Sequence, residues 1–220
     1  MTVFACNTAV SRYSSRMIKP IRWSSFVRDF IVIQIGFAVF ALSIALLIQA
    51  NLGTSPWVML TVALSDIIGW SVGTLTILIG FVVLAGSLYF KEQIGWGTLG
   101  NILCIGPWLD GALLLVPSVT GNWPIQLLML FASALLMGMA TAVYIGVDAG
   151  AGPRDTLMLA VTRNSRLSLR QARATIELIV LLFGVLLGGP VGWGTVIFAL
   201  IIGPAVQWGF RLFGVEAKKG

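Results

Sequence analysis

Gly95-Trp96-Gly97-Thr98 and Gly192-Trp193-Gly194-Thr195 are the same four residues, 97 positions apart. The same offset places Gly106-Pro107 on Gly203-Pro204 without any gap in the alignment. Over sixty-one paired positions at this offset, sixteen are identical. A period this long is not a solenoid repeat. It indicates a duplicated half-protein, which in a membrane chain is typical of transporter architecture.

The composition places the chain in a membrane. Hydrophobic residues make up 58% of it and charged residues only 10%, whereas soluble domains average about 25% charged residues. The chain has no histidine, and its two cysteines, Cys6 and Cys104, lie far apart in sequence. We therefore expect no disulfide, no metal site and no cofactor. The net charge of +6 is read as a determinant of membrane topology rather than as a sign of a nucleic-acid partner.

Six stretches are long and apolar enough to cross the bilayer, which takes about 17–25 helical residues for about 30 Å of hydrocarbon. They lie near 30–50, 72–90, 97–117, 124–146, 170–189 and 194–212. The sequence therefore predicts an all-α, polytopic membrane protein with six transmembrane helices.

Two further apolar stretches are too short to cross. Ser55–Gly69 lies between the first and second predicted spans, and Pro153–Ser165 lies between the fourth and fifth. A dozen helical residues reach only about 18 Å. We expect both stretches to form short interfacial or re-entrant helices, the first with Ser55 as its N-cap and Pro56 in its first turn.

The basic residues predict the orientation. With a cytoplasmic N-terminus and six crossings, all fourteen Lys and Arg residues fall on the cytoplasmic side or at an inner helix end, as the positive-inside rule requires. We expect a multi-pass protein of the cell (inner or plasma) membrane with both termini in the cytoplasm. The predicted divisions are a basic cytoplasmic arm (1–29), a first membrane repeat (30–117), a second membrane repeat (118–212) and a cytoplasmic tail (213–220).

Each predicted repeat holds three crossings and one short helix. Because three is an odd number, the second repeat enters the membrane from the opposite side. We therefore expect two inverted repeats, related by a pseudo-two-fold axis in the membrane plane. In transporters of this kind the substrate site lies near the bilayer midplane, between the repeats.

The second half also carries a longer pattern of glycines, prolines and charges. It comprises Gly150-Ala151-Gly152-Pro153-Arg154-Asp155, Arg173, Glu177, Gly188-Gly189-Pro190-Val191-Gly192-Trp193-Gly194-Thr195 and Gly203-Pro204. Together with Leu52-Gly53-Thr54-Ser55-Pro56-Trp57, this run resembles the YczE/YyaS-type family of bacterial integral membrane proteins over about residues 30–212. The resemblance implies a membrane fold. It implies no substrate, because the family is largely uncharacterised.

Candidate substrate-binding residues lie at the starts of the two short helices. They are Ser55, Pro56, Gly152, Pro153, Arg154 and Asp155. The N-terminus of a half-helix offers free backbone N–H groups to an anion or a carbonyl group. In the plainer interpretation, Gly150–Gly152 is only a flexible exit from the fourth span. Arg154 and Asp155 are then either a solvated pair or a gate that pairs with Arg170 or Arg173.

Further candidates lie within the predicted spans. Glu177 lies nine residues after Ser168, a predicted N-cap, and so about 13 Å along the helix. A carboxylate at that depth is costly and indicates a function. Arg173 lies one turn earlier on the same face, so the pair is either a structural lock or part of a transport site. Asp110, whose repeat mate is Gln207, either contacts a polar substrate or only reaches the outer interface.

The two Gly-Pro pairs should affect the third span of each repeat. A proline within a helix kinks or breaks it. A break would free backbone carbonyl groups, which in lipid must face protein, water or substrate. A kink alone would create no site.

These features favour a small secondary transporter or permease with a small polar or anionic substrate. The alternative is a non-transport membrane component that scaffolds or regulates a partner protein through the basic arm and the 147–173 loop. We expect no enzyme, because the sequence has no nucleotide motif and no pair of carboxylates beside a nucleophile.

The topology can be tested by cysteine labelling in intact cells. A cysteine placed within 118–123 should react with a membrane-impermeant thiol reagent added from outside, whereas Ala217→Cys should not, because the basic residues hold the tail in the cytoplasm. The reverse labelling would contradict both the orientation and the expected inversion of the repeats.

Overall fold

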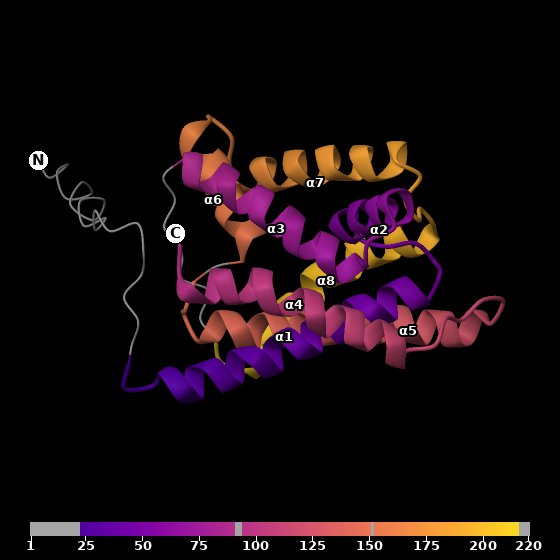
Figure 1. Ribbon diagram of the computed structural model, residues 1–220, viewed down its shortest axis with the longest axis horizontal. Helices are drawn as coiled ribbons and strands as arrows, with labels where there is room; N and C mark the ends of the chain where they lie inside the picture. The colour runs from indigo at the N-terminus through magenta and orange to yellow at the C-terminus, as the bar shows by residue number, and fades with distance from the viewer. Residues whose placement is uncertain (1–22, 91–93, 151, 216–220) are drawn as a thin grey trace, which may run out of the picture.

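The computed structural model describes residues 23–90, 94–150 and 152–215. These residues form eight α-helices and contain no strand (Figure 1). The predicted all-α class is therefore confirmed for this part of the chain. Residues 1–22 of the predicted arm, Lys91 and residues 216–220 of the predicted tail lie outside the described residues.

Five helices are long and apolar enough to cross a membrane. They are α1 (Phe26–Gln49), α3 (Val72–Tyr89), α4 (Trp96–Leu115), α5 (Trp123–Gly146) and α8 (Trp193–Leu212). The remaining predicted span is also a helix, α7 (Leu169–Leu186). Its first half carries Arg170, Arg173 and Glu177, so its composition is less apolar, and its crossing stays a prediction.

The two short helices form where the sequence predicts them. They are α2 (Pro56–Ile68) and α6 (Pro153–Asn164). Ser55 is the N-cap residue of α2 and Gly152 that of α6, and each is followed by a proline in the first turn. Neither cap makes a side-chain hydrogen bond, so the start of each helix is fixed by its backbone and its proline.

The helices recur in pairs at the offset of the sequence repeat. The helices α5, α7 and α8 begin and end 97 residues after α1, α3 and α4, while α6 begins 97 residues after α2 and ends one residue earlier than its counterpart. Left-handed backbone conformations recur in the same way. Asn51 and Asp148 have φ of 51° and 56°, and Gly53 and Gly150 have φ of 103° and 134°. The duplication in the sequence is thus matched in local structure.

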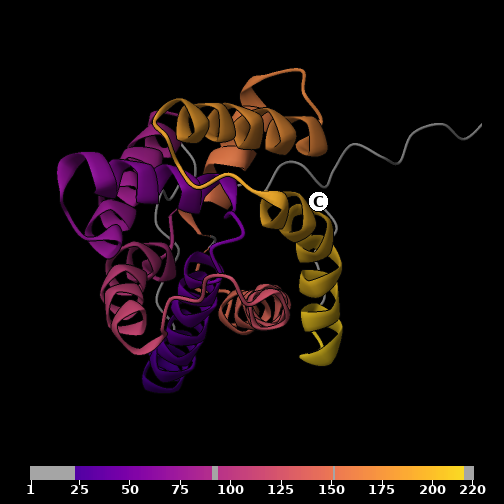
Figure 2. The same ribbon diagram turned by 90° about the vertical axis from the view of Figure 1, so that its right-hand side faces the viewer.

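Packing divides the helices into two layers (Figures 1 and 2). In one layer α1 packs against α4 and α5, and α5 packs against α8. In the other, α2 packs against α7, α3 packs against α6, and weaker contacts join α2 to α3 and α6 to α7. We call these the α1/α4/α5/α8 layer and the α2/α3/α6/α7 layer. Each half of the chain contributes two helices to each layer.

Small residues bring the long helices close together. A Cβ atom on Gly209 of α8 would lie 2.5 Å from the carbonyl oxygen of Gly138 of α5. Close packing of this kind drives the association of helices within a membrane, where no hydrophobic effect acts between them.

Pro107 and Pro204 lie inside the continuous helices α4 and α8. Of the two predicted alternatives, the break is therefore wrong, and the kink stays a prediction. Each proline removes one N–H group from its helix, and the rest of the helix continues.

Two sets of backbone contacts join the two halves of the chain. In the 52/194 seam, the N–H group of Gly194 donates to the carbonyl oxygen of Leu52 at 2.7 Å. In the 97/149 seam, the N–H group of Gly97 donates to the carbonyl oxygen of Ala149 at 3.0 Å. The two bonds are equivalent in the repeat, because Gly194 is the repeat mate of Gly97 and Ala149 is the repeat mate of Leu52. The two contacts are reciprocal.

The seams lie at opposite ends of α1 and α5. The side-chain amide of Gln126, in the first turn of α5, donates to the carbonyl oxygen of Ala50 at the end of α1 at 2.8 Å. The helices α1 and α5 are therefore antiparallel. Leu52 follows the end of α1 and Ala149 follows the end of α5, so the 52/194 seam and the 97/149 seam lie on opposite faces of the protein.

Gly95 should tolerate no side chain. A Cβ atom at this position would collide with the carbonyl oxygen of Ala149, so Gly95→Ala should lower the free energy of unfolding by about 2–4 kcal/mol. Gly111→Ala within α4, the helix that Gly95 precedes, is the control, because a Cβ atom there has open space around it, and it should raise the free energy of unfolding by about 0.5–1 kcal/mol. Thermal unfolding in detergent measures both. Equal melting temperatures for the two variants would show that the seam is not tightly packed.

Candidate functional site

The starts of the two short helices meet. Arg154 follows Pro153 in the first turn of α6, and Trp57 follows Pro56 in the first turn of α2. The Cζ atom of the Arg154 guanidinium lies 4.8 Å from the centroid of the Trp57 ring, a cation–π distance. The two residues are equivalent in the repeat. Their contact places both helix starts where the two halves of the chain meet.

Polar groups from three helices converge on Gly152. A Cβ atom built on Gly152 would lie 3.6 Å from Oδ2 of Asp155 and 3.9 Å from both Nδ2 of Asn101 and Oη of Tyr144. Asn101 belongs to α4 and Tyr144 to α5. The start of α6 therefore faces the α1/α4/α5/α8 layer through polar rather than apolar side chains.

Four charged groups surround the start of α6. Burial lowers the pKa of Arg154 from its usual value, and the charge of Glu177 acts in the opposite direction. Burial raises the pKa of Asp155, and the charges of Arg173 and Arg154 act against that rise. The two charges of α6 thus interact with the two charges of α7. The opposite charges of Glu177 and Arg173 thus offset part of the cost of burying Arg154 and Asp155.

We call Trp57, Asn101, Tyr144, Arg154, Asp155, Arg173 and Glu177 the central cluster. Gly152 and Pro153 are buried at its edge, Glu177 is half-buried, and Arg173 is exposed. Glu177 acts electrostatically on Arg154, whereas Arg173 acts on Asp155. A cluster of this kind can exchange an internal ionic partner for a charged group of a solute or for a proton.

The other predicted site residues lie elsewhere or play a structural part. Ser55 and Pro56 are half-buried at the start of α2. Asp110 accepts hydrogen bonds from the Ser71 hydroxyl at 2.6 Å and from the Gly73 N–H group at 2.8 Å, so it caps the start of α3. Gln207 is exposed on α8.

Sequence reasoning missed three members of the central cluster. Trp57 is the repeat mate of Arg154, and equivalent residues at the starts of two half-helices are the ones that a two-fold arrangement brings together. That signal was available in the sequence. Asn101 and Tyr144 are polar residues in long, mostly apolar helices with no motif around them, and their position beside Gly152 follows only from the packing of α4 and α5.

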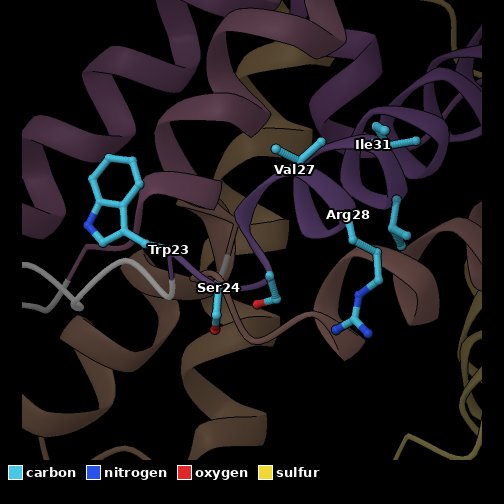
Figure 3. A pocket seen from close by; sticks show the side chains of 7 residues that line it. Trp23, Ser24, Val27, Arg28 and Ile31 are labelled. Carbon is cyan, nitrogen blue, oxygen red and sulfur yellow. The ribbon is translucent and has the colours of Figure 1, made fainter.

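An open pocket lies at the start of α1, away from these residues. It is lined by Trp23, Ser24, Ser25, Val27, Arg28, Ile31 and Val32 (Figure 3). Beside it, Asp29 is buried and accepts a hydrogen bond from the Ser25 hydroxyl at 2.7 Å. The pocket shares no residue with the central cluster, and apart from Ser24, Ser25 and Arg28 its lining is apolar.

The contact between Arg154 and Trp57 should be measurable as an energetic coupling. In a double-mutant cycle with Arg154→Met and Trp57→Leu, the two losses of stability should differ from additivity by about 0.5–2 kcal/mol. Thermal unfolding in detergent of the four proteins supplies the cycle. Additive losses would mean that the two side chains do not interact.

Comparison with known proteins identifies relatives across most of the chain. Residues 27–211 match the family described as "Family of unknown function (DUF6198)". An "Uncharacterized protein" of Haemophilus influenzae is 31% identical over 176 residues, covering 80% of each chain. The "Uncharacterized membrane protein YczE" of Bacillus subtilis is 28% identical over 179 residues, covering 80% of each chain.

A further Bacillus subtilis relative, "Uncharacterized protein YyaS", is 31% identical over 167 residues, which cover 74% of this chain and 83% of the relative. No solved structure matches the chain. The resemblance predicted from the glycine, proline and charge pattern is confirmed. The chain is a membrane protein that belongs to this family of unknown function, DUF6198.

Proposed function

We propose that the protein is a small secondary transporter or permease, in which six spans form two inverted repeats and the substrate site is the central cluster. The contact between Trp57 and Arg154 is the observation that carries the proposal. It joins equivalent positions of the two halves at the starts of two half-helices, which is where inverted-repeat transporters hold their substrates.

The direction of equivalent helices supports the inversion. The helices α1 and α5 are equivalent in the repeat and antiparallel to one another, as the hydrogen bond from Gln126 to Ala50 requires. Repeats related by an axis along the membrane normal would instead have equivalent helices running the same way. The reciprocal seams at opposite ends of α1 and α5 support the same interpretation.

The surface of α7 supports its role as a sixth span. Its charged residues all lie in its first half, and its equivalent, α3, is long and apolar enough to cross. Its second half presents large apolar side chains outward. They are Leu178, Ile179, Leu182, Phe183, Val185 and Leu186. A surface of this kind is suited to lipid rather than to water.

The residues of the central cluster suggest the substrate. Arg154 and the free N–H groups at the start of α6 attract negative charge, while Asp155 and Glu177 attract positive charge. A small polar or anionic solute would be bound by the first set and released when the carboxylates regain their arginine partners. The distribution of the basic residues supports a location in the cell membrane with both termini in the cytoplasm. The proposed transport uses no cofactor and no enzymatic step.

Glu177→Gln tests the role of the carboxylate, because it keeps the shape of the side chain and removes its charge. In proteoliposomes, uptake of small solutes such as formate, phosphate, glycine and glutamate should include at least one solute that the unmodified protein moves faster than protein-free liposomes. For that solute Glu177→Gln should lower the flux by about tenfold or more, with expression and melting temperature preserved.

Asp66→Asn is the matched control, because Asp66 is an exposed acid on α2 outside the cluster, and it should leave the flux unchanged. A purely structural role for Glu177 would instead lower the melting temperature and spare the flux per folded protein. If no solute moves faster than in protein-free liposomes, the transport proposal fails and the scaffold alternative gains support.

A further inference from the structure

We propose that the structure is one of two access states, and that the α2/α3/α6/α7 layer rocks on the α1/α4/α5/α8 layer between them. In this state α3 rests on α4. In the other, α7 rests on α8 while α3 leaves α4. The inference rests on the proposed transport function, because two access states have a purpose only where a solute crosses.

The two layers meet unequally. The helices α3 and α4 pack extensively, whereas their equivalents α7 and α8 make at most marginal contact within the described residues. Every other strong contact between helices recurs between the equivalent helices of the repeat. The contact between α2 and α7, for example, recurs between α6 and α3. The two halves are therefore packed alike, except that α3 contacts α4 whereas α7 hardly contacts α8.

Equivalent glycines have opposite surroundings at these two places. A Cβ atom on Gly106 would lie 2.6 Å from the carbonyl oxygen of Gly73 and 2.7 Å from Cγ1 of Ile77. A Cβ atom on its equivalent, Gly203, would meet no atom within 4 Å. Gly106 thus allows α3 to pack closely against α4. Gly203 offers the same small surface on α8, but no helix packs on it.

Equivalent polar residues differ in the same way. Asp110 holds the start of α3 through the Ser71 hydroxyl and the Gly73 N–H group, at 2.6 and 2.8 Å. Its equivalent, Gln207, is exposed on α8. An amide oxygen accepts the same backbone hydrogen bond as a carboxylate oxygen. Gln207 therefore has the chemistry to cap the start of α7 when α7 approaches α8.

The closed α7–α8 contact cannot copy the α3–α4 contact in every detail. Arg170 stands where α3 has Gly73, and a Cβ atom at Gly73 would collide with the carbonyl oxygen of Gly106. The start of α7 must therefore stop further from α8. The long Arg170 side chain spans that extra distance and can donate to the Gln207 amide oxygen.

Two links between the layers supply the hinges of this motion. The residues between α1 and α2 and between α5 and α6 connect the two layers, and both links contain glycine with positive φ, Gly53 and Gly150. Hinges of this kind absorb a rotation in a few loop residues while the packed helices move as units. The start of α7 lies on the side that carries the basic residues, so the present state is closed on the outer side and open on the cytoplasmic side.

Cysteine cross-linking tests the two states in native membranes. With Cys6 and Cys104 replaced by serine, Ala174→Cys and Gly203→Cys report on α7–α8, because their equivalents Ile77 and Gly106 touch in α3–α4. Asp110→Ala removes the hydrogen bonds that hold α3 on α4. It should therefore raise the rate of disulfide trapping between positions 174 and 203 by about tenfold, although Asp110 lies at the other side of the protein.

Three comparisons complete the test. Asp66→Ala removes an acid that takes no part in the contact between α3 and α4, and it should not change the rate of disulfide trapping, while Gln207→Ala should lower that rate. Gly80→Cys with Ile102→Cys reports on α3–α4 directly, because a Cβ atom on Gly80 lies 3.5 Å from Cβ of Ile102, within disulfide range. This second disulfide should form readily without other changes and form more slowly with Asp110→Ala.

The two proposals fail in different ways. If Asp110→Ala changes neither disulfide while solute flux in proteoliposomes persists, rocking is overturned and transport stands. If the disulfides respond as expected but no solute moves, the transport proposal is overturned, and with it the interpretation of the two conformations as access states.

Discussion

The backbone must satisfy its own hydrogen bonds wherever water is excluded, and the seams meet this requirement where the helices start and stop. In each seam a glycine N–H group at the start of a long helix donates to a carbonyl oxygen from the opposite half, Gly97 to Ala149 and Gly194 to Leu52. The Thr98 and Thr195 hydroxyls accept from Gly95 and Gly192 at 3.4 Å.

The repeated Gly-Trp-Gly-Thr motif therefore has a structural explanation. Its first glycine leaves no room for a side chain, its second donates across the seam, and its threonine closes the first turn of the helix. These contacts hold the links that lead into α2 and α6. The starts of the two short helices are consequently brought together, and the contact between Trp57 and Arg154 depends on that placement.

The two halves have the same helices but differ in the charge of their side chains around the central cluster. At positions where the second half has Arg154, Asp155 and Glu177, the first half has Trp57, Val58 and Gly80. The duplicated scaffold thus supplies shape and apolar surface from one side and charge from the other. The charges of Arg154 and Asp155 can be kept at the start of α6 because Glu177 and Arg173 of α7 offset part of the cost of their burial.

The sequence predicted the positions of the helices, because hydrophobic length and helix-start residues are local signals and the repeat keeps one offset of 97 residues. The short helices at Pro56 and Pro153 and the capping box of Ser168 with Gln171 were predictable for this reason. The role of Asp110 was not predictable. Asp110 caps α3 through hydrogen bonds to Ser71 and Gly73, which lie 39 and 37 positions earlier in the sequence. The difference between α3–α4 and α7–α8 was not predictable either, because α4 and α8 carry the same Gly-Pro pair and only the packing shows which of them has a helix on it.

The inversion of the repeats is the central claim, and cysteine labelling at two equivalent positions tests it most directly. Ile68 ends α2 and its repeat mate Ser165 follows α6, and both residues are exposed. In a cysteine-free background, a membrane-impermeant thiol reagent added to sealed right-side-out vesicles should label Ile68→Cys and leave Ser165→Cys unlabelled until the vesicles are opened. Labelling of both positions from the same side would contradict the account.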